Sequence, residues 1–158
     1  MISKLNKSDF IKRLEQNTKV GDPKIKGTPI AVFTMFGKTR KKFYGEYTNS
    51  AFRLTKNAIL LPIPYIFEGT LKSKEKTTTE VSLNIKPIWF GYLWIRIMPA
   101  LGLIFINLIL IDNGKNIEPE VYFLVNTFLL FMFTPILFTI RKRNKLLKDF
   151  YRIFEISD

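Results

Sequence analysis

The stretch that begins at Ile88 and ends at Ile111 reads IWFGYLWIRIMPALGLIFINLILI, and the stretch from Val121 to Ile140 reads VYFLVNTFLLFMFTPILFTI. The first stretch contains a single charge, that of Arg96, and the second contains none. A helix needs about 20 mostly apolar residues to cross the hydrocarbon core of a bilayer. A hairpin buried in a soluble core is disfavoured, because the rest of the 158-residue chain is too small to enclose it. We therefore predict two transmembrane helices.

Charge predicts the orientation of these helices. The connector 112–120, DNGKNIEPE, is short and rich in turn residues, so the two helices should form an antiparallel hairpin. It carries one lysine against three acids, whereas residues 1–87 carry 17 lysines and arginines against 7 acids. The residues that follow the second stretch are also basic: Arg141, Lys142, Arg143 and Lys145. Basic flanks remain cytoplasmic, so we predict a two-pass bacterial plasma (inner) membrane protein with both termini in the cytoplasm.

The N-terminal part, residues 1–87, is expected to form a cytoplasmic, strand-rich module. Residues 1–16 carry charge throughout and lack an apolar segment, so no cleavable export signal is expected there. An N-terminal helix is predicted over residues 8–19, with Ser8 as its cap. The β-type runs after it are separated by turn residues; they cover residues 29–36, 41–47, 50–56, 64–72 and 77–86.

The last of these runs alternates between apolar and polar residues, which is typical of a strand with one buried and one wet face. Val81, Leu83 and Ile85 should face the core. The predicted fold class is therefore α+β: a small antiparallel β-sheet or curled half-barrel with an N-terminal helix, plus the transmembrane hairpin at residues 88–140. Residues 141–158 should add a basic, amphipathic C-terminal helix that packs on the sheet or lies on the membrane surface.

Several polar residues lie within the predicted spans. Arg96 should lie about one helical turn below the interface and extend its guanidinium back to water or lipid phosphate. Asn107 and Asn126 fall at similar depth, which predicts a hydrogen bond across the hairpin, with Thr127 on a nearby arc. The alternative is a polar path for a solute or proton, which would require an oligomer. Two prolines within the spans, Pro99 and Pro135, are each expected to bend a helix.

The composition removes many catalytic chemistries. The chain has no cysteine and no histidine, so it offers no thiolate nucleophile, imidazole base or Cys/His zinc site. The remaining acid–base candidates are Glu46, Glu68 and Glu80, and each falls on a plausible wet strand face. We therefore expect no enzymatic activity, no cofactor and no metal; an enzyme acting on a membrane-proximal substrate is the less favoured alternative.

Basic clusters are the strongest non-apolar features of a chain whose net charge is +12. Lys38, Arg40, Lys41 and Lys42 form a turn that topology does not require, so it is either an ordinary solvated turn or a contact for anionic lipid. The cluster after the second span is explained by topology and is a second candidate for lipid contact. Nucleic acid is not an expected partner, because no paired aromatic RNA-recognition motif is present.

Three stretches carry a family resemblance: LNKSDFIKRLEQNTKVG (5–21), KKFYGEYTNSAFRLTKN (41–57) and YIFEGTLKSKEKTTTEVSLNIKP (65–87). With the aromatic-rich span that follows, they resemble a loose group of small uncharacterised bacterial membrane proteins with a strand-rich cytoplasmic module and a two-helix hairpin. The resemblance implies this architecture and no activity. The leading hypothesis is a non-enzymatic, membrane-anchored module that binds anionic lipid or a partner protein. The alternative is a subunit of an oligomeric transport or channel assembly, in which Asn107, Asn126 and Arg96 line an interface.

Overall fold

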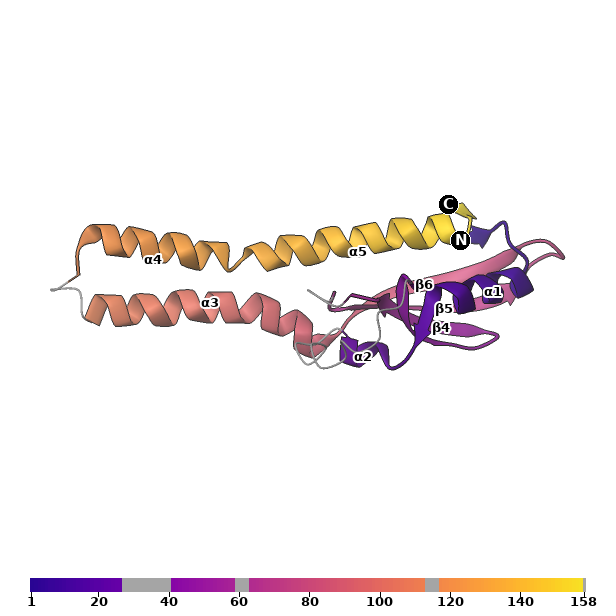
Figure 1. Ribbon diagram of the computed structural model, residues 1–158, viewed down its shortest axis with the longest axis horizontal. Helices are drawn as coiled ribbons and strands as arrows, with labels where there is room; N and C mark the ends of the chain where they lie inside the picture. Colours follow the sequence, from indigo (N-terminus) through magenta and orange to yellow (C-terminus); the bar gives the residue numbers. More distant parts are fainter. Residues whose placement is uncertain (27–40, 59–62, 113–116, 158) are drawn as a thin grey trace.

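A computed structural model describes residues 1–26, 41–58, 63–112 and 117–157. The molecule is elongated: a helical hairpin occupies one end and a strand-rich module the other (Figure 1). The described part is a mixed α+β structure with a seven-stranded sheet and two long apolar helices. The strand expected at residues 29–36 lies outside the described residues.

The sheet has the order β2-β3-β4-β5-β6-β1-β7. Its strands are β1 (Ile2–Ser3), β2 (Thr18–Val20), β3 (Phe43–Tyr47), β4 (Ala51–Lys56), β5 (Tyr65–Ser73), β6 (Thr79–Pro87) and β7 (Ile156–Ser157). Strands β3 to β6 form the expected antiparallel meander. The sheet is not wholly antiparallel, however, because β2 pairs with β3 in parallel. A long connection, residues 21–42, separates these two strands, and parallel pairing needs such a crossover.

The alternation predicted for the last long strand is confirmed. In β6 the side chain of Val81 is 1% exposed, while Glu80 and Ser82 on either side are exposed. In β5, Phe67 is fully buried and Lys72 is exposed. One face of the sheet is therefore packed and the other is wet.

The N-terminal helix, α1 (Lys7–Asn17), differs at both ends from the prediction of residues 8–19. Its cap is Asn6 and not Ser8: the Asn6 Oδ1 accepts a hydrogen bond from the Asp9 backbone N–H at 2.9 Å. The Asn6 amide also donates to the Asp9 carboxylate at 2.8 Å, so the cap is bonded in both directions. The helix ends at Asn17 because the chain there extends directly into β2.

The hairpin contains α3 (Trp89–Asp112), α4 (Pro119–Phe131) and α5 (Thr134–Ile153). A single residue, Ile88, separates β6 from α3, so the sheet is joined to the hairpin without a linker. The second apolar stretch is interrupted between α4 and α5, next to Pro135. Pro135 cannot donate to the carbonyl one turn earlier, that of Phe131, which instead accepts a hydrogen bond from the Thr134 hydroxyl at 2.8 Å. Pro99 lies inside α3.

Two helical segments, Trp89–Asp112 and Pro119–Ile153, are long and apolar enough to cross a membrane. In their most apolar windows only 6% and 11% of the residues are buried. The core helix of a soluble protein would be mostly buried, so these helices present their apolar side chains outward. This agrees with a two-pass membrane protein.

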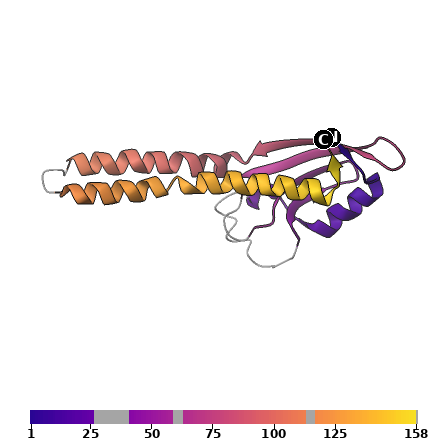
Figure 2. The same cartoon turned by 90° about the horizontal axis from the view of Figure 1, so that it is seen from above.

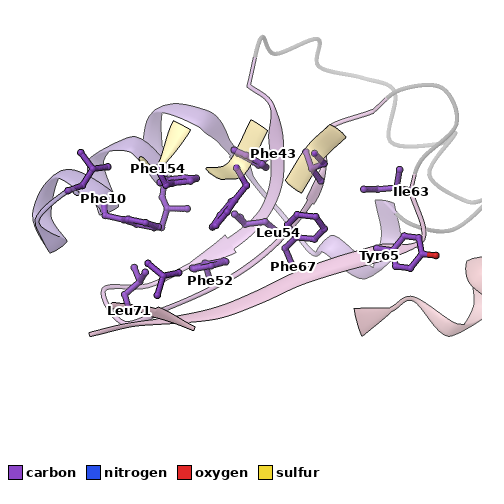
Figure 3. Close-up of a cluster of buried hydrophobic side chains, with 14 residues drawn as sticks. Phe10, Phe43, Phe52, Leu54, Ile63, Tyr65, Phe67, Leu71 and Phe154 are labelled. Atoms are coloured by element: carbon purple, nitrogen blue, oxygen red, sulfur yellow. The ribbon is translucent and has the colours of Figure 1, made fainter. Parts of the chain in front are cut away.

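Helix α5 does not stop where its apolar stretch ends. It runs from the hairpin across the strands of the module (Figure 2). There Leu146 and Phe150 enter a buried cluster together with Phe154, the residue that caps the helix. The rest of the cluster comes from α1, the sheet and the segments between them (Figure 3): Leu5, Phe10, Leu14, Phe43, Phe52, Leu54, Ile63, Tyr65, Phe67, Leu71 and Val81. The predicted C-terminal segment 141–158 is thus continuous with the second span, and its apolar side chains pack on the sheet.

Aromatic rings dominate this core. The ring of Phe150 is within 6.5 Å, centroid to centroid, of the rings of Phe10, Phe43, Phe52 and Phe67, and it lies 4.6 Å from Phe154. Each fully buried aromatic side chain stabilises the fold by about 1.5–3 kcal/mol. Phe150 therefore attaches the end of the hairpin to the module.

We expect Phe150→Ala to lower the free energy of unfolding of the module by about 3–5 kcal/mol, since it empties the centre of an aromatic cluster. The measurement is thermal unfolding of the full chain in mild detergent, followed through the β-sheet circular dichroism signal. Phe128→Ala is the matched control, because the Phe128 side chain on α4 is 68% exposed. Equal losses in the two variants would show that α5 does not contribute to the core.

Candidate functional site

The fold brings described members of the two basic clusters of the sequence together. Lys41 and Lys42 directly precede β3, and Lys56 ends β4. The antiparallel register places Phe43 opposite Lys56, so these lysines lie at one end of the sheet. Helix α5 then places Lys145 beside them. The result is a pocket of about 370 Å³ lined by Lys41, Lys42, Lys56, Asn57, Lys145, Leu146 and Asp149.

The pocket lies where the sheet meets the hairpin. The hydroxyl of Thr55, next to Lys56, donates to the carbonyl of Tyr65 at 2.8 Å. Tyr65 pairs with Pro87, two residues before α3 begins. The lysines of the pocket therefore lie at the base of the apolar hairpin. The turns of α5 that follow the second span begin at the same end of the hairpin.

The lysines of the pocket have different partners. The Lys41 ammonium donates to the carbonyls of Glu15 at 2.8 Å and of Thr18 at 3.1 Å. These carbonyls end α1, where a positive charge complements the helix dipole. Lys41 therefore has a structural role that its position in a basic turn did not reveal. Lys42 and Lys145 are exposed.

Lys56 reports the electrostatic character of the pocket. Burial lowers the pKa of Lys56, and the nearby charges of Lys142 and Lys145 lower it further, while Asp149 raises it. Asp149 is itself paired with Arg152, with a nitrogen–oxygen distance of 2.7 Å. The one carboxylate of the pocket lining is thus shared with a cation outside it, and positive charge remains in excess.

The other lipid-contact candidates that the structure describes lie on α5. Arg141 is exposed at the start of the basic segment of α5. Arg143 places its guanidinium over the ring of Tyr65, 5.3 Å from the ring centroid. Lys38 and Arg40 lie outside the described residues.

Arg96 turns toward the module. Its Nη2 donates to the Tyr65 hydroxyl at 3.4 Å, and its guanidinium lies 3.7 Å from the centroid of the Tyr92 ring. A cation over an aromatic face is favourable by about 0.5–2 kcal/mol. Arg96 of α3 and Arg143 of α5 thus both contact Tyr65 of the sheet. From the sequence, the Arg96 guanidinium is expected to reach water or lipid phosphate; in the structure it contacts the Tyr65 hydroxyl and the Tyr92 ring.

Asn107 and Asn126 form a reciprocal pair across the hairpin. The Asn107 amide donates to the Asn126 Oδ1 at 2.9 Å, and the Asn126 amide donates to the Asn107 Oδ1 at 3.1 Å. Each amide also donates to the carbonyl one turn earlier, Leu103 at 2.8 Å and Tyr122 at 3.0 Å. All four amide hydrogens are therefore used within the hairpin. Thr127 is exposed on α4.

The three glutamates considered for catalysis do not converge. Glu46 and Glu68 lie opposite Arg53 from its two sides, and Glu80 is four residues along β6 from the partner of Glu68. Only Glu68 of the three lines the shallow cavity of about 330 Å³ on the wet face. In the part of the chain that the structure describes, no group of three or more Asp or Glu side chains is placed to hold a metal ion.

Comparisons with protein-family models, with curated proteins and with solved structures found no match. The resemblance to small bacterial membrane proteins therefore stays a prediction. The functional argument rests on the geometry of the chain itself.

The Asn107–Asn126 pair predicts a measurable coupling. Replacing either asparagine by leucine removes the hydrogen-bond partner of the other across the hairpin, so the two single variants should be non-additive by about 1 kcal/mol. The measurement is a double-mutant cycle of detergent-titrated unfolding with Asn107→Leu, Asn126→Leu and both together. Additive single effects would contradict the pair; Thr127→Leu, at an exposed position, is the control.

Glu68 predicts a pH dependence. Its carboxylate pairs with Lys86 at 2.6 Å and with Arg53 at 3.1 Å, and hydrogen bonds from Lys86 and then Arg53 hold its pKa below the ordinary 4.5, against the opposing effect of burial. Because the folded pKa is the lower one, the contribution is complete above the unfolded pKa and is lost as pH falls through the folded pKa.

We expect Glu68→Gln to lower the free energy of unfolding at neutral pH by about 0.5–1 kcal/mol. The difference from the parent chain should close between neutral pH and an acidic pH below the lowered pKa of Glu68, where its carboxyl group is protonated and neutral like the amide. Thermal unfolding at the two pH values measures this. Glu75→Gln, at an exposed turn residue, should change stability at neither pH.

Proposed function

We propose that the chain is an integral, two-pass protein of the bacterial plasma membrane, with both termini and the β module in the cytoplasm. The outward apolar surfaces of Trp89–Asp112 and Pro119–Ile153 support insertion. The concentration of lysine and arginine in residues 1–87 and in the segment after Ile140 supports the orientation, since the connector is acidic.

We further propose that the module binds anionic lipid headgroups and has no enzymatic activity. The observation that carries this proposal is the lysine-lined pocket at the base of the hairpin. In the proposed orientation it lies next to the inner leaflet, whose anionic lipids attract each nearby basic side chain by about 1 kcal/mol. The glutamates lie apart on the wet face, which argues against acid–base chemistry.

A subunit of a transport or channel assembly is the second candidate, and the hairpin weighs against it. The amides of Asn107 and Asn126 are bonded to each other and to their own helices, so they offer no hydrogens to a passing solute. The lipid experiment also distinguishes lipid binding from the binding of a partner protein.

The lipid experiment uses the full chain in mild detergent and native mass spectrometry with added lipid. We expect phosphatidylglycerol to bind more tightly than phosphatidylcholine. The Lys56→Gln/Lys145→Gln double variant should weaken the binding of phosphatidylglycerol by about fivefold, because it removes two positive charges from the pocket. Lys74→Gln/Lys76→Gln removes the same charge at exposed positions of the distant β5–β6 turn and should leave binding unchanged. Equal binding of both lipids, unaffected by either variant, would favour a protein partner. The same spectra also give the oligomeric state of the chain.

The orientation is tested with single cysteines, because the natural chain has none. Asn49 and Glu118 are exposed at the module and at the outer end of the hairpin. A membrane-impermeant maleimide added to intact cells should label the Glu118→Cys variant. It should label the Asn49→Cys variant only after permeabilisation; labelling of Asn49→Cys in intact cells would overturn the orientation.

A further inference from the structure

We infer that the pocket at the base of the hairpin selects a phosphate monoester, the headgroup of a lipid such as phosphatidic acid, over phosphodiester headgroups. This inference rests on the proposed function, and it names the ligand class of the same pocket. Its basis is that Lys42, Lys56 and Lys145 line one cavity from the residue before β3, from β4 and from α5.

The first argument is charge. Among the described residues that line the pocket, Lys41, Lys42, Lys56 and Lys145 stand against the single carboxylate of Asp149. Asp149 is paired with Arg152, so its negative charge does not neutralise the lysines of the pocket. The Lys41 amine is bonded to backbone carbonyls, which leave its positive charge in place. A phosphate monoester carries about −1.5 to −2 charge near neutral pH, whereas a phosphodiester carries a single one. The monoester is therefore the better counterion for this excess.

The second argument is the number and type of donors. A monoester presents three terminal oxygens that accept strong hydrogen bonds, one more than a diester. Lysine ammonium groups are compact, rotatable point charges, and Lys42, Lys56 and Lys145 approach from three different elements. Three separate amines suit three equivalent oxygens, while a planar carboxylate would be better matched by an arginine fork.

The third argument is the shape of the cavity. At about 370 Å³ it is at the small end of ligand pockets, and Leu146 and Asn57 form part of its wall. A headgroup that adds its own ammonium, as in phosphatidylserine or phosphatidylethanolamine, would bring a like charge among the lysines. A bare phosphate avoids this repulsion.

The fourth argument is protonation. The half-buried Lys56 amine is held at a lowered pKa by desolvation and by Lys142 and Lys145, with Asp149 opposing. The same positive field that disfavours its proton favours the second ionisation of a bound phosphate monoester. Preference for the monoester should therefore depend on pH around the second phosphate pKa of about 6.

The test is native mass spectrometry of the full chain in mild detergent, titrated in separate arms with dioleoyl phosphatidic acid and dioleoyl phosphatidylglycerol. At about pH 7.5 we expect phosphatidic acid to bind about tenfold more tightly, and at about pH 5.5 the ratio should be smaller, because most of the free monoester then carries a single charge. Lys56→Gln/Lys145→Gln should remove this preference, and Lys74→Gln/Lys76→Gln should retain it.

A third arm adds soluble glycerol 3-phosphate as competitor. Failure to displace phosphatidic acid supports a lipid-borne monoester; displacement at equal concentration supports the monoester chemistry and assigns it to a soluble compound. If Lys56→Gln/Lys145→Gln does not fold, Lys42→Gln at an exposed position gives the same comparison.

Equal affinities for phosphatidic acid and phosphatidylglycerol, both weakened by the lysine variants, overturn the selectivity and leave headgroup binding in place. Equal binding of phosphatidylcholine, with no effect of the variants, overturns both proposals.

Discussion

The insertion of Phe150 and Phe154 into the module is the contact on which the rest of the structure depends. Both side chains are fully buried, and both belong to the same helical run that leaves the apolar hairpin at Thr139 and Ile140. A helix is stiff over these few turns, so packing its far end on the sheet sets the position of its near end. The antiparallel pairing of β1 with β7 closes the same end of the module, where the two termini lie side by side in both views (Figures 1 and 2).

The second link between hairpin and sheet is at the far end of β6, because β1 pairs with the start of that strand and α3 follows its end. There β6 passes into α3 through one residue, and Arg96 and Arg143 both contact Tyr65. With α3 and α5 both joined to the sheet, the basic side chains after the second span cannot move independently of β3 and β4. Lys145 reaches the lysines of those strands for this reason. The pocket forms where the hairpin packs against the sheet. Part of its positive charge comes from the basic segment after the second apolar stretch, the segment from which we propose the orientation of the hairpin.

The polar residues of the hairpin form hydrogen bonds between and within its helices. Lipid tails are as apolar as leucine, so helices in a bilayer gain little from hydrophobic association and rely on packing and hydrogen bonds. The closed ring of amides between Asn107 and Asn126 supplies such bonds, and the Thr134 hydroxyl satisfies the carbonyl that Pro135 leaves free. Both arrangements are internally complete, which is the expected condition for polar groups in a structural anchor and not for groups that line a pathway.

The sequence alone determined the order of the main elements: two apolar stretches, a strand-rich remainder and the buried face of the long strands. The length of an apolar stretch and the period-two alternation of a strand can be read from neighbouring residues alone. The sequence also indicated that Asn107 and Asn126 lie at one depth, since counting from a tight turn measures distance along two helices. It misplaced the cap of α1 and missed the parallel pairing of β2 with β3, because caps depend on a single side-chain geometry and pairing on a distant segment. Only the tertiary structure decided that Lys42, Lys56 and Lys145 share one pocket and that Lys41 binds the end of α1. The pocket joins Lys145 to lysines about a hundred positions earlier because α5 packs on the sheet, an outcome that neither charge nor periodicity encodes. The Lys41 contacts join residues 26 and 23 positions apart, and they depend on where α1 ends beside β3.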